Sequence, residues 1–411
     1  MSGMNILKRT GPGIIVAATG LGAGDIVAAS AAGAQFGTIL LWAVIFGGIL
    51  KFVITEGIGR WQLATDTTLL EGWIDRLPRF FSWYFVVYLF LWTFMVAAAM
   101  MAACGLAAYA FFPQLSVGTW GALHAIAALV IVWVGKYQML ETAMKFFIGL
   151  MFITVIACAV MVLPDLGDIA AGLLIPSVPE AGMAYVLGII GGVGGSITIM
   201  SYGYWMREAG WQGREMMPVM RVDLAVAYTL TALFGVAIII VSAGVQPEVV
   251  SGNNMAIAVA DQLVPVMGET GKWIFLFGFW GAVFSSMIGV WHGVPFLFAN
   301  FVYHYKQHSH LLESHASISR TRSYRGYLLY LAILPMSLLL LERPVWIVIT
   351  YAVTGAVFMP LLAALLLYMN SKPQWLGSHS NTWKSKLLLV VSLLVFGYLM
   401  VLQILSYLAG S

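Results

Sequence analysis

Long runs of apolar residues follow one another along the chain, separated by short polar stretches. A helix that crosses a membrane needs about 20 mostly apolar residues. By that measure the sequence predicts eleven spans, of which the third and eighth are long and the ninth is short. The spans are expected at residues 12–33, 38–58, 81–111, 116–135, 143–163, 183–206, 222–244, 271–303, 326–342, 345–369 and 387–409.

The charges in the connecting stretches predict the orientation of these spans. With the N-terminus in the cytoplasm, nearly all Lys and Arg residues lie on the cytoplasmic side, and only Lys272 and Arg343 lie outside. The loop after the fifth span carries Asp165, Asp168 and Glu180 but no basic residue. This asymmetry follows the positive-inside rule. We therefore expect an inside N-terminus, an outside C-terminus and a first span that is not cleaved as a signal peptide.

Composition narrows the class of protein further. Of the 411 residues, 61% are hydrophobic and 9% are charged, whereas soluble domains are near a quarter charged. We therefore expect one transmembrane domain over residues 1–411, with the lipid bilayer as its partner and no nucleic-acid partner. Cys104 and Cys158 lie in apolar runs and are interpreted as packing residues. The histidine-containing stretch 304–325 is interpreted as a solvated loop rather than a metal site.

The first span contains polar features that a plain membrane helix would not need. The stretch ATGLGAGDIVAAS, residues 18–30, carries Gly20, Gly22 and Gly24 at alternate positions, followed by Asp25. Each glycine lowers helix propensity by about 1 kcal/mol relative to alanine, so the helix is expected to break here. An ionised aspartate near the bilayer centre costs about 2.5–3.5 kcal/mol, and a bound cation would offset that cost. Carbonyl oxygens freed by the break would be further ligands.

A second interruption is expected five spans later. The stretch GIIGGVGGSITIMSYGYW, residues 188–205, is rich in glycine, and Gly194 and Gly195 mark the predicted break. Broken helices at matching positions of two halves indicate an inverted-repeat transporter. The predicted first repeat, second repeat and extra helix cover about 12–163, about 183–369 and about 387–409.

Structural roles also account for these residues when each is taken singly. Asp25 could cap the second half of the broken helix or pair with a buried lysine, and membrane glycines often serve close helix packing. The coincidence of two breaks with one intramembrane acid favours the functional interpretation. We therefore predict a cation site formed by Asp25, Gly22, Thr198, Ser201 and Met200.

Other polar residues within the spans have structural interpretations. Glu56 and Arg60 are spaced i,i+4 at the end of the second span, which favours an ion pair or an inner gate. Lys51 lies within the same span. His292 in the eighth span is interpreted as a hydrogen-bonded core histidine in preference to a proton relay. Asp223 is expected at the membrane interface, where the seventh span begins.

Short stretches outside the breaks carry a family resemblance. They are GPG at 11–13, AGAQFGTILLW at 32–42, GRWQLATDTTLLEG at 59–72 and GAVFSSMIGVWHG at 281–293. Together with GGVGGSITIM at the second break, they resemble the NRAMP divalent-metal transporters. The resemblance implies an all-α membrane fold, with the 5+5 inverted repeat of the amino acid transporter (APC) superfamily and with helices 1 and 6 broken.

Two departures from the family pattern concern the cation ligands. The family's first-helix motif Asp-Pro-Gly-Asn aligns with GAGD at 22–25, so the acid stands at the last place of the motif. The sixth-helix motif Met-Pro-His aligns with TIM at 198–200, and a shift of two residues would put Met200 at the ligand place. Oxygen ligands suit Mg²⁺, Mn²⁺ or Ca²⁺, and members of the family's magnesium-transporting branch also replace the sixth-helix methionine.

These observations predict a secondary transporter or facilitator in a bacterial cytoplasmic membrane, with Mg²⁺ or Mn²⁺ as substrate and no cofactor. The proton path of the resembled family runs through charged groups in the third span, whereas residues 81–111 here contain no charged side chain. This departure implies that proton coupling is weak or absent. The alternative is a carrier of a small organic solute such as an amino acid, with the solute's ammonium group at Asp25. An intramembrane enzyme would need a cluster of catalytic side chains that the sequence does not present. The sequence does not indicate the oligomeric state.

Overall fold

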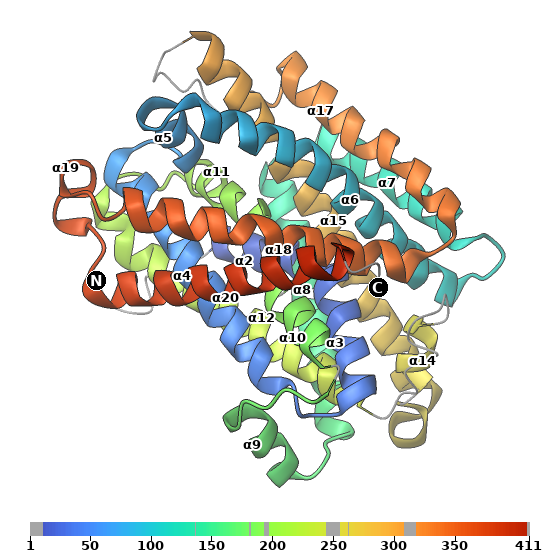
Figure 1. The fold of residues 1–411 in the computed structure, drawn as a ribbon. Helices are drawn as coiled ribbons and strands as arrows, with labels where there is room; N and C mark the ends of the chain where they lie inside the picture. The colour runs from blue at the N-terminus through green and yellow to red at the C-terminus, as the bar shows by residue number, and fades with distance from the viewer. Residues whose placement is uncertain are drawn as a thin grey trace.

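The computed structural model of the protein is almost entirely helical (Figure 1). It describes residues 11–135, 137–180, 182–192, 197–243, 255–261, 263–307 and 318–408. Within these residues the regular elements are α-helices and short 3-10 helices, as the apolar runs predict.

The first part of the chain forms a broken helix followed by long helices. Helices α2 (Pro12–Gly20) and α3 (Ala23–Phe36) occupy the first predicted span, with Leu21 and Gly22 between them. Pro12 begins α2, where its fixed φ angle suits the first helical turn. The elements that follow are α4 (Leu41–Thr65), α5 (Leu69–Arg76), α6 (Arg79–Phe111), α7 (Val117–Val134), α8 (Tyr137–Met161) and α9 (Leu166–Leu174).

The second part also begins with an interrupted helix. Helix α10 (Met183–Gly192), the 3-10 helix η1 (Ile197–Ser201) and α11 (Tyr202–Glu208) occupy the sixth predicted span. The elements that follow are η2 (Arg214–Met216), α12 (Met217–Ser242), α14 (Met255–Asp261), α15 (Val264–Gln307), α17 (Arg322–Ile333), η3 (Leu334–Leu341), α18 (Pro344–Met369), α19 (Pro373–Leu376), η4 (Gly377–His379) and α20 (Trp383–Leu408).

The helix lengths fit a membrane protein. Among the described residues, eight helices are long and apolar enough to cross a membrane. The broken first and sixth helices and α18 overlap further predicted spans, while the total of eleven stays a prediction. The ninth predicted span continues from α17 into η3 as a 3-10 helix, because Pro335 has no N–H to continue the α-helical pattern.

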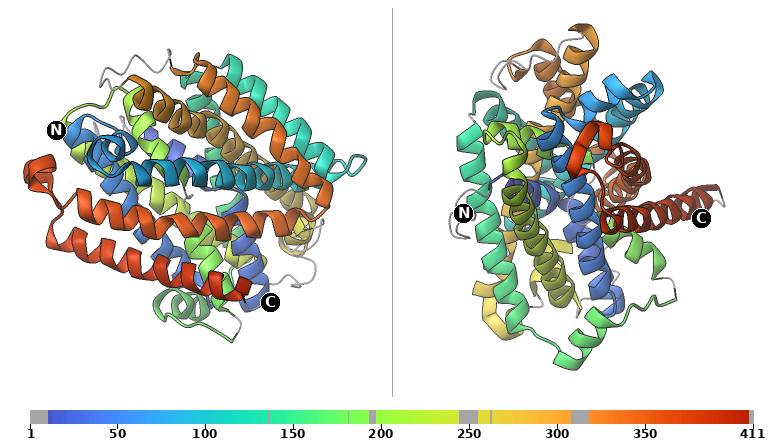
Figure 2. Two further views of the ribbon diagram at one scale, coloured as in Figure 1. Left: turned by 45° about the horizontal axis from the view of Figure 1, so that its top comes forward. Right: turned by 90° about the vertical axis from the view of Figure 1, so that its left-hand side faces the viewer.

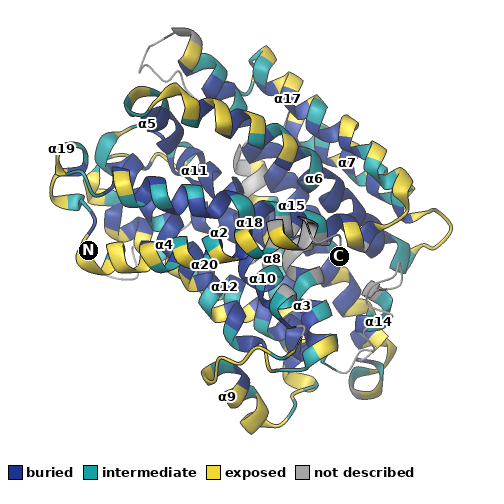
Figure 3. Ribbon diagram, viewed as in Figure 1, coloured by how far each residue is buried: buried dark blue, intermediate teal, exposed yellow. Residues whose placement is uncertain are grey.

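The helices differ in how far they are covered by protein. The membrane-length window of α15 is 78% buried, whereas that of α20 is 22% buried. Helix α20 packs on α18 and α4 at the outside of the bundle (Figure 2). Buried residues gather in the centre, and exposed residues lie on the outer helices and loops (Figure 3). Exposed apolar side chains such as Leu91, Ile153 and Leu394 on the outer helices suit contact with lipid.

Loops that are predicted to lie on one side of the membrane meet at one end of the bundle. Arg60 in α4 donates hydrogen bonds to the carbonyl oxygen of His379 and to Asn381 Oδ1. Arg214 in η2 donates to the carbonyl oxygen of Ala64. The segments before α5, after α11 and before α20 therefore form one polar end, which the positive-inside rule predicts to be cytoplasmic.

Candidate cation-binding site

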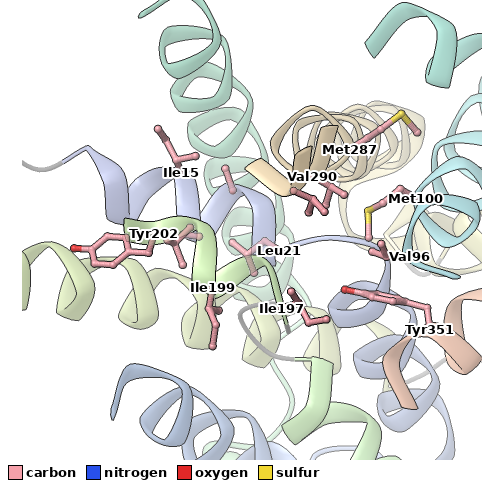
Figure 4. Close-up of a cluster of buried hydrophobic side chains, with 14 of the residues drawn as sticks. Ile15, Leu21, Val96, Met100, Ile197, Ile199, Tyr202, Met287, Val290 and Tyr351 are labelled. Atoms are coloured by element: carbon pink, nitrogen blue, oxygen red, sulfur yellow. The ribbon is translucent and has the colours of Figure 1, made fainter. Parts of the chain in front are cut away.

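The two broken helices meet in the middle of the bundle. Helix α2 contacts η1, and both contact α15. Leu21 in the first break and Ile197 and Ile199 of η1 belong to one buried apolar cluster (Figure 4). Apolar surroundings lower the local dielectric, so a charge placed at the breaks would interact strongly with polar groups there.

The first break is tighter than an open loop. Ser286 Oγ donates to the carbonyl oxygen of Thr19 at 2.6 Å. The carbonyl oxygens of Gly20 and Gly22 accept hydrogen bonds from the N–H groups of Gly22 and Ile26, at 2.9 and 3.2 Å. The carbonyl oxygens of Thr19, Gly20 and Gly22 are therefore not free of hydrogen bonds as expected. Ser286 of α15 reaches the first of them, and backbone N–H groups at the break and in α3 reach the other two. Each of these oxygens keeps a second lone pair.

Helix α15 presents small residues to both broken helices. A Cβ atom on Gly289 would clash with Thr19 Oγ1, and one on Gly293 would lie 3.0 Å from Ser201 Oγ. Both hydroxyl oxygens are buried and have no hydrogen-bond partner among the described residues. A buried polar group without a partner costs about 1–3 kcal/mol. The two hydroxyl groups could therefore form polar contacts with a ligand bound at this junction.

The other predicted ligands of the second break are also buried. Thr198 and Met200 are 4% and 3% exposed in η1, and Ser201 ends that element. Gly22 lies in the first break, where a Cβ atom would clash with Ser286 Oγ. The 3-10 helix η1 contacts α15, and Gly22 faces Ser286 of the same helix α15.

The acid of the predicted site lies at the start of a half-helix. Asp25 is in the first turn of α3, after Gly24, and its side chain lies outside the described part of the chain. A carboxylate is favourable there because of the positive end of the helix dipole. Gly20 ends α2, while Gly194 and Gly195 lie outside the described residues. In the part that is described, no three or more His, Cys, Asp or Glu side chains come together as a metal site.

A buried lysine, to which sequence reasoning assigned no role, reaches the second break. Lys51 in α4 is fully buried, and its Nζ donates to the carbonyl oxygen of Gly191 at 3.1 Å. The same Nζ lies 5.8 Å from the ring centroid of Phe396. Gly191 is in the last turn of α10, where the negative end of the helix dipole favours a cation. A protein side chain therefore contacts the end of the half-helix that is suited to a positive charge.

His292 has the surroundings of a core histidine. Trp205 Nε1 donates to His292 Nδ1 at 3.4 Å, and the hydroxyl of Tyr324 donates to the carbonyl oxygen of His292 at 3.2 Å. The imidazole also packs edge-to-face on Phe296. A ring nitrogen that accepts a hydrogen bond carries no proton. This geometry favours the core interpretation over a proton relay.

Glu56 and Arg60 form an ion pair at the end of α4, with 3.1 Å between Arg60 Nε and Glu56 Oε2. Glu56 Oε1 accepts a second bond, at 3.1 Å, from Nε of Arg221. Arg60 Nη2 lies 2.7 Å from Asn381 Oδ1. The pair therefore joins α4 to α12 and to the segment before α20, which is compatible with both of its predicted roles.

A second ion pair fixes the half-helix that follows the second break. Arg207 in α11 donates two hydrogen bonds to Glu71 of α5, at 3.2 and 3.1 Å. Glu71 also accepts from the N–H of Thr68 and from Asn300 Nδ2. Burial acts to raise the pKa of Glu71, but Arg207 and these hydrogen bonds outweigh it and lower that pKa. The available sequence signal was the capping-box spacing of Thr68 and Glu71.

Asp223, which was expected at the membrane interface where the seventh span begins, lies near the start of α12 and is fully buried within the protein. Its depth in the membrane stays a prediction. Its carboxylate accepts hydrogen bonds from the N–H groups of Gly11 and Gly13, at 3.0 and 2.6 Å, and from the Tyr202 hydroxyl at 3.0 Å. These N–H groups lie at the start of α2, where a helix has no internal acceptors. A Cβ atom on Gly13 would lie 2.6 Å from Asp223 Oδ2, so this close contact requires glycine at position 13.

The chain matches a known family over nearly its whole length. Residues 13–406 match the family described as natural resistance-associated macrophage protein-like. The divalent metal cation transporter MntH of Deinococcus radiodurans is 25% identical over 290 residues, covering 66% of this chain and 64% of that protein. MntH of Pectobacterium carotovorum is 24% identical over 299 residues, 69% of each chain. The alignment with MntH of Deinococcus radiodurans spans less than two thirds of the length of that protein.

Solved structures agree with the predicted fold. A manganese transporter from Eremococcus coleocola superposes with a TM-score of 0.81 at 15% identity, covering 100% of this chain and 89% of that chain. MhsT in complex with L-phenylalanine gives a TM-score of 0.61 at 17% identity, covering 96% and 98%. These likenesses confirm the predicted inverted-repeat fold with broken helices. The relatives are membrane transporters, in agreement with the prediction that this protein is not an enzyme. The chain belongs to the natural resistance-associated macrophage protein (NRAMP) family of membrane transporters.

Proposed function

We propose that this protein moves a divalent metal cation across the membrane through the region where its two broken helices meet. The observation that carries the proposal is the convergence of α2 and η1 on α15, with the buried hydroxyl groups of Thr19 and Ser201 at that junction. Family membership supports it, because the curated relatives are divalent metal cation transporters.

The proposed ligands are those that the sequence predicts. Asp25 supplies the negative charge, and Gly22 supplies the second lone pair of its main-chain oxygen. Thr198 and Ser201 supply hydroxyl oxygens, and Met200 a thioether or main-chain oxygen. A mainly oxygen set suits Mn²⁺ or Mg²⁺, and Mg²⁺ needs few direct ligands because it keeps several waters. The manganese transporters among the structural neighbours make Mn²⁺ the first ion to test.

Weak or absent proton coupling is part of the proposal. Residues 81–111 of α6 contain no Asp, Glu, Lys, Arg or His. His292, the candidate relay, accepts a hydrogen bond from Trp205 at 3.4 Å. Neither feature supplies a titratable chain that would carry a proton alongside the metal.

A second candidate function has one observation in its favour. Lys51 places a buried ammonium group against the end of α10, where its Nζ lies 3.1 Å from the Gly191 carbonyl oxygen. A positive charge at this point would repel a divalent cation but would attract a carboxylate. This favours a carrier of a small zwitterion, with the solute's ammonium group at Asp25 and its carboxylate near Lys51.

Uptake into proteoliposomes distinguishes the two functions. We expect saturable uptake of Mn²⁺ or Mg²⁺ by the wild type, no matching pH change inside the vesicles, and loss of uptake in Asp25→Ala. Asp25→Asn is the matched control, since it removes the charge and keeps the shape. Metal uptake by Asp25→Ala at the wild-type rate would refute the site, and stoichiometric proton movement would refute the uncoupled mechanism.

Substitution of Lys51 distinguishes the metal transporter from the zwitterion carrier. In a metal transporter, Lys51→Met removes a repelling charge and is expected to leave metal uptake unchanged or faster. In a zwitterion carrier, the same change should abolish uptake of amino acids. Saturable amino acid uptake without metal flux would establish the second function.

The topology is also a proposal. We infer that residues 12–163 and 183–369 form the two repeats, with both ends placed as the positive-inside rule predicts. Single cysteines in place of Ser380 and Asp168 would test it in intact cells. A membrane-impermeant thiol reagent should label only the second.

A further inference from the structure

A polar cavity lies at the α5 end of the bundle, apart from the broken helices. It has a volume of about 670 Å³, and its lining residues come from α5 and the residue Thr67 before it, the start of α6 and the end of α15. None of its lining residues belongs to α2, α3 or η1, so it is not part of the proposed cation pathway. The end of α15 is held against α5 by His304, whose Nε2 lies 2.9 Å from Asp75 Oδ1.

Two arginines give the cavity a positive charge. Arg76 ends α5, and Arg79 begins α6. The Arg76 guanidinium lies 4.9 and 5.2 Å from the ring centroids of Trp61 and Trp375, and these cation–π contacts hold it in place. Arg76 and Arg79 outnumber Asp75, the one acidic residue of the lining, so the lining has an excess of positive charge.

The lining also contains donor groups that lack acceptors. Arg76 Nη1 and Ser82 Oγ are buried, and neither has a hydrogen-bond partner among the described residues. Ser82 is 3% exposed, and the side chain of Tyr305 lines the same space. Guanidinium and hydroxyl donors are the groups that proteins use to bind phosphate oxygens. The composition of the cavity therefore points to an oxyanion.

The surface next to the cavity is aromatic. Phe80 is 69% exposed and Trp83 is 47% exposed at the start of α6. The Trp83 ring lies 5.5 Å from those of Phe301 and Tyr305 at the end of α15. Exposed Trp and Tyr side chains are typical of the headgroup level of a membrane. The cavity therefore lies where a lipid headgroup could enter while its acyl chains lie along α6.

We propose that this cavity binds a phosphate group, with the phosphodiester headgroup of an anionic phospholipid as its ligand. A phosphodiester carries one negative charge, which is complementary to the excess positive charge of the lining. Basic pockets between membrane helices on the cytoplasmic side are known to bind such headgroups. Helix α5 also carries Glu71, which holds Arg207 of α11. A bound headgroup would thereby stabilise the contact that fixes the half-helix after the second break.

The test uses the full-length protein in detergent and needs no transport. Phosphatidylglycerol, phosphatidylcholine and inorganic phosphate are titrated separately, with thermal unfolding and native mass spectrometry as readouts. We expect saturable binding and a higher melting temperature with phosphatidylglycerol only. Arg76→Gln and Arg79→Gln should each weaken that binding about five-fold, and Ser82→Ala should weaken it less.

The controls separate specific binding from charge and from folding. Lys384→Gln, at an exposed position in α20, removes one positive charge outside the cavity and should leave binding unchanged. An equal loss in Lys384→Gln would overturn the proposal. Inorganic phosphate that binds as well as lipid through the same arginines would identify a soluble ligand and overturn the lipid assignment. Arg79 is exposed, so Arg79→Gln tests binding without removing the stacking of Arg76.

Discussion

Two buried carboxylates at the polar end of the bundle and two buried hydroxyl groups in its centre differ in how far their hydrogen bonds are satisfied. At the end, Glu71 faces Arg207, and Asp223 accepts three hydrogen bonds from α2 and α11. In the centre, the hydroxyl groups of Thr19 and Ser201 are buried without hydrogen-bond partners among the described residues. Both regions lie beside the same broken helices.

We interpret the paired carboxylates as groups that stabilise the fold, and the unpaired hydroxyl groups as groups that serve transport. Buried charges that are paired from several sides stabilise one arrangement of helices, because removing either partner leaves the other desolvated. Buried hydroxyl groups without partners destabilise the fold slightly and gain energy when a ligand arrives. We therefore expect substitutions at the end to change the free energy of unfolding, and substitutions in the centre to change transport.

The largest effect on stability is expected for Glu71→Ala. This substitution leaves Arg207 buried without its carboxylate and should lower the free energy of unfolding by about 3–5 kcal/mol. Denaturant unfolding in detergent measures it. Glu215→Ala, which removes an exposed acid from η2 at the same end, is the control and should change stability by less than about 0.5 kcal/mol. Equal effects of the two substitutions would contradict the assignment.

Asp223→Ala should have the next largest effect and lower the free energy of unfolding by about 2–4 kcal/mol, because two N–H groups at the start of α2 lose their acceptor. Asp223→Asn keeps the shape and one acceptor oxygen, so an intermediate loss is expected. Thermal unfolding of the three proteins in one detergent provides the comparison. No change in Asp223→Ala would mean that the start of α2 does not depend on this carboxylate.

The pH dependence of stability should report the same ion pair with a smaller effect. The pKa of Glu71 is lowered in the folded protein, so its stabilising contribution is complete above the unfolded value of about 4.3. The contribution is lost as the pH falls through the lowered folded value. The stability difference between wild type and Glu71→Gln should therefore narrow on acidification below about pH 4. A difference that stays constant would exclude this contribution of the Glu71 carboxylate.

The smallest effects on stability are expected in the centre. Thr19→Val and Ser201→Ala remove hydroxyl groups that lack partners, so the free energy of unfolding should change by less than about 1 kcal/mol, or rise. Metal uptake should fall several-fold in Ser201→Ala, measured as the concentration dependence of the initial rate. Ser285→Ala is the control, because Ser285 already donates to the carbonyl oxygen of Ala282. Unchanged uptake in Ser201→Ala would remove this residue from the site.

Local features predicted the position of the first break well. The interruption between Gly20 and Ala23 falls where the alternate glycines stand, because helix propensity depends on the residues of the segment itself. The length of an apolar run is equally local, and the positions of α6, α12 and α15 follow from it. The departure of residues 198–200 from the family motif is also readable from the sequence, although the ligand role of this stretch stays a prediction.

Pairings across the fold were not predictable in the same way. Asp223 and Gly11 are separated by 212 positions, Lys51 and Gly191 by 140, and nothing in the pattern around either acid or lysine indicates its partner. The hydrogen-bond partners of Asp223 were therefore not predicted, and Lys51 had no assigned role. The bonds accepted by the Thr19 and Gly22 carbonyl oxygens could not be anticipated either, since they depend on how close α15 and α3 come to the break.

The sequence by itself determined which segments are apolar enough to enter a membrane and where the first of them cannot remain helical. Only the tertiary structure decided which buried charges are satisfied and which hydroxyl groups are left over. The reason is physical: hydrophobic length and helix propensity are properties of neighbouring residues, whereas the satisfaction of a buried polar group depends on distant segments that only the packed fold brings within hydrogen-bond distance.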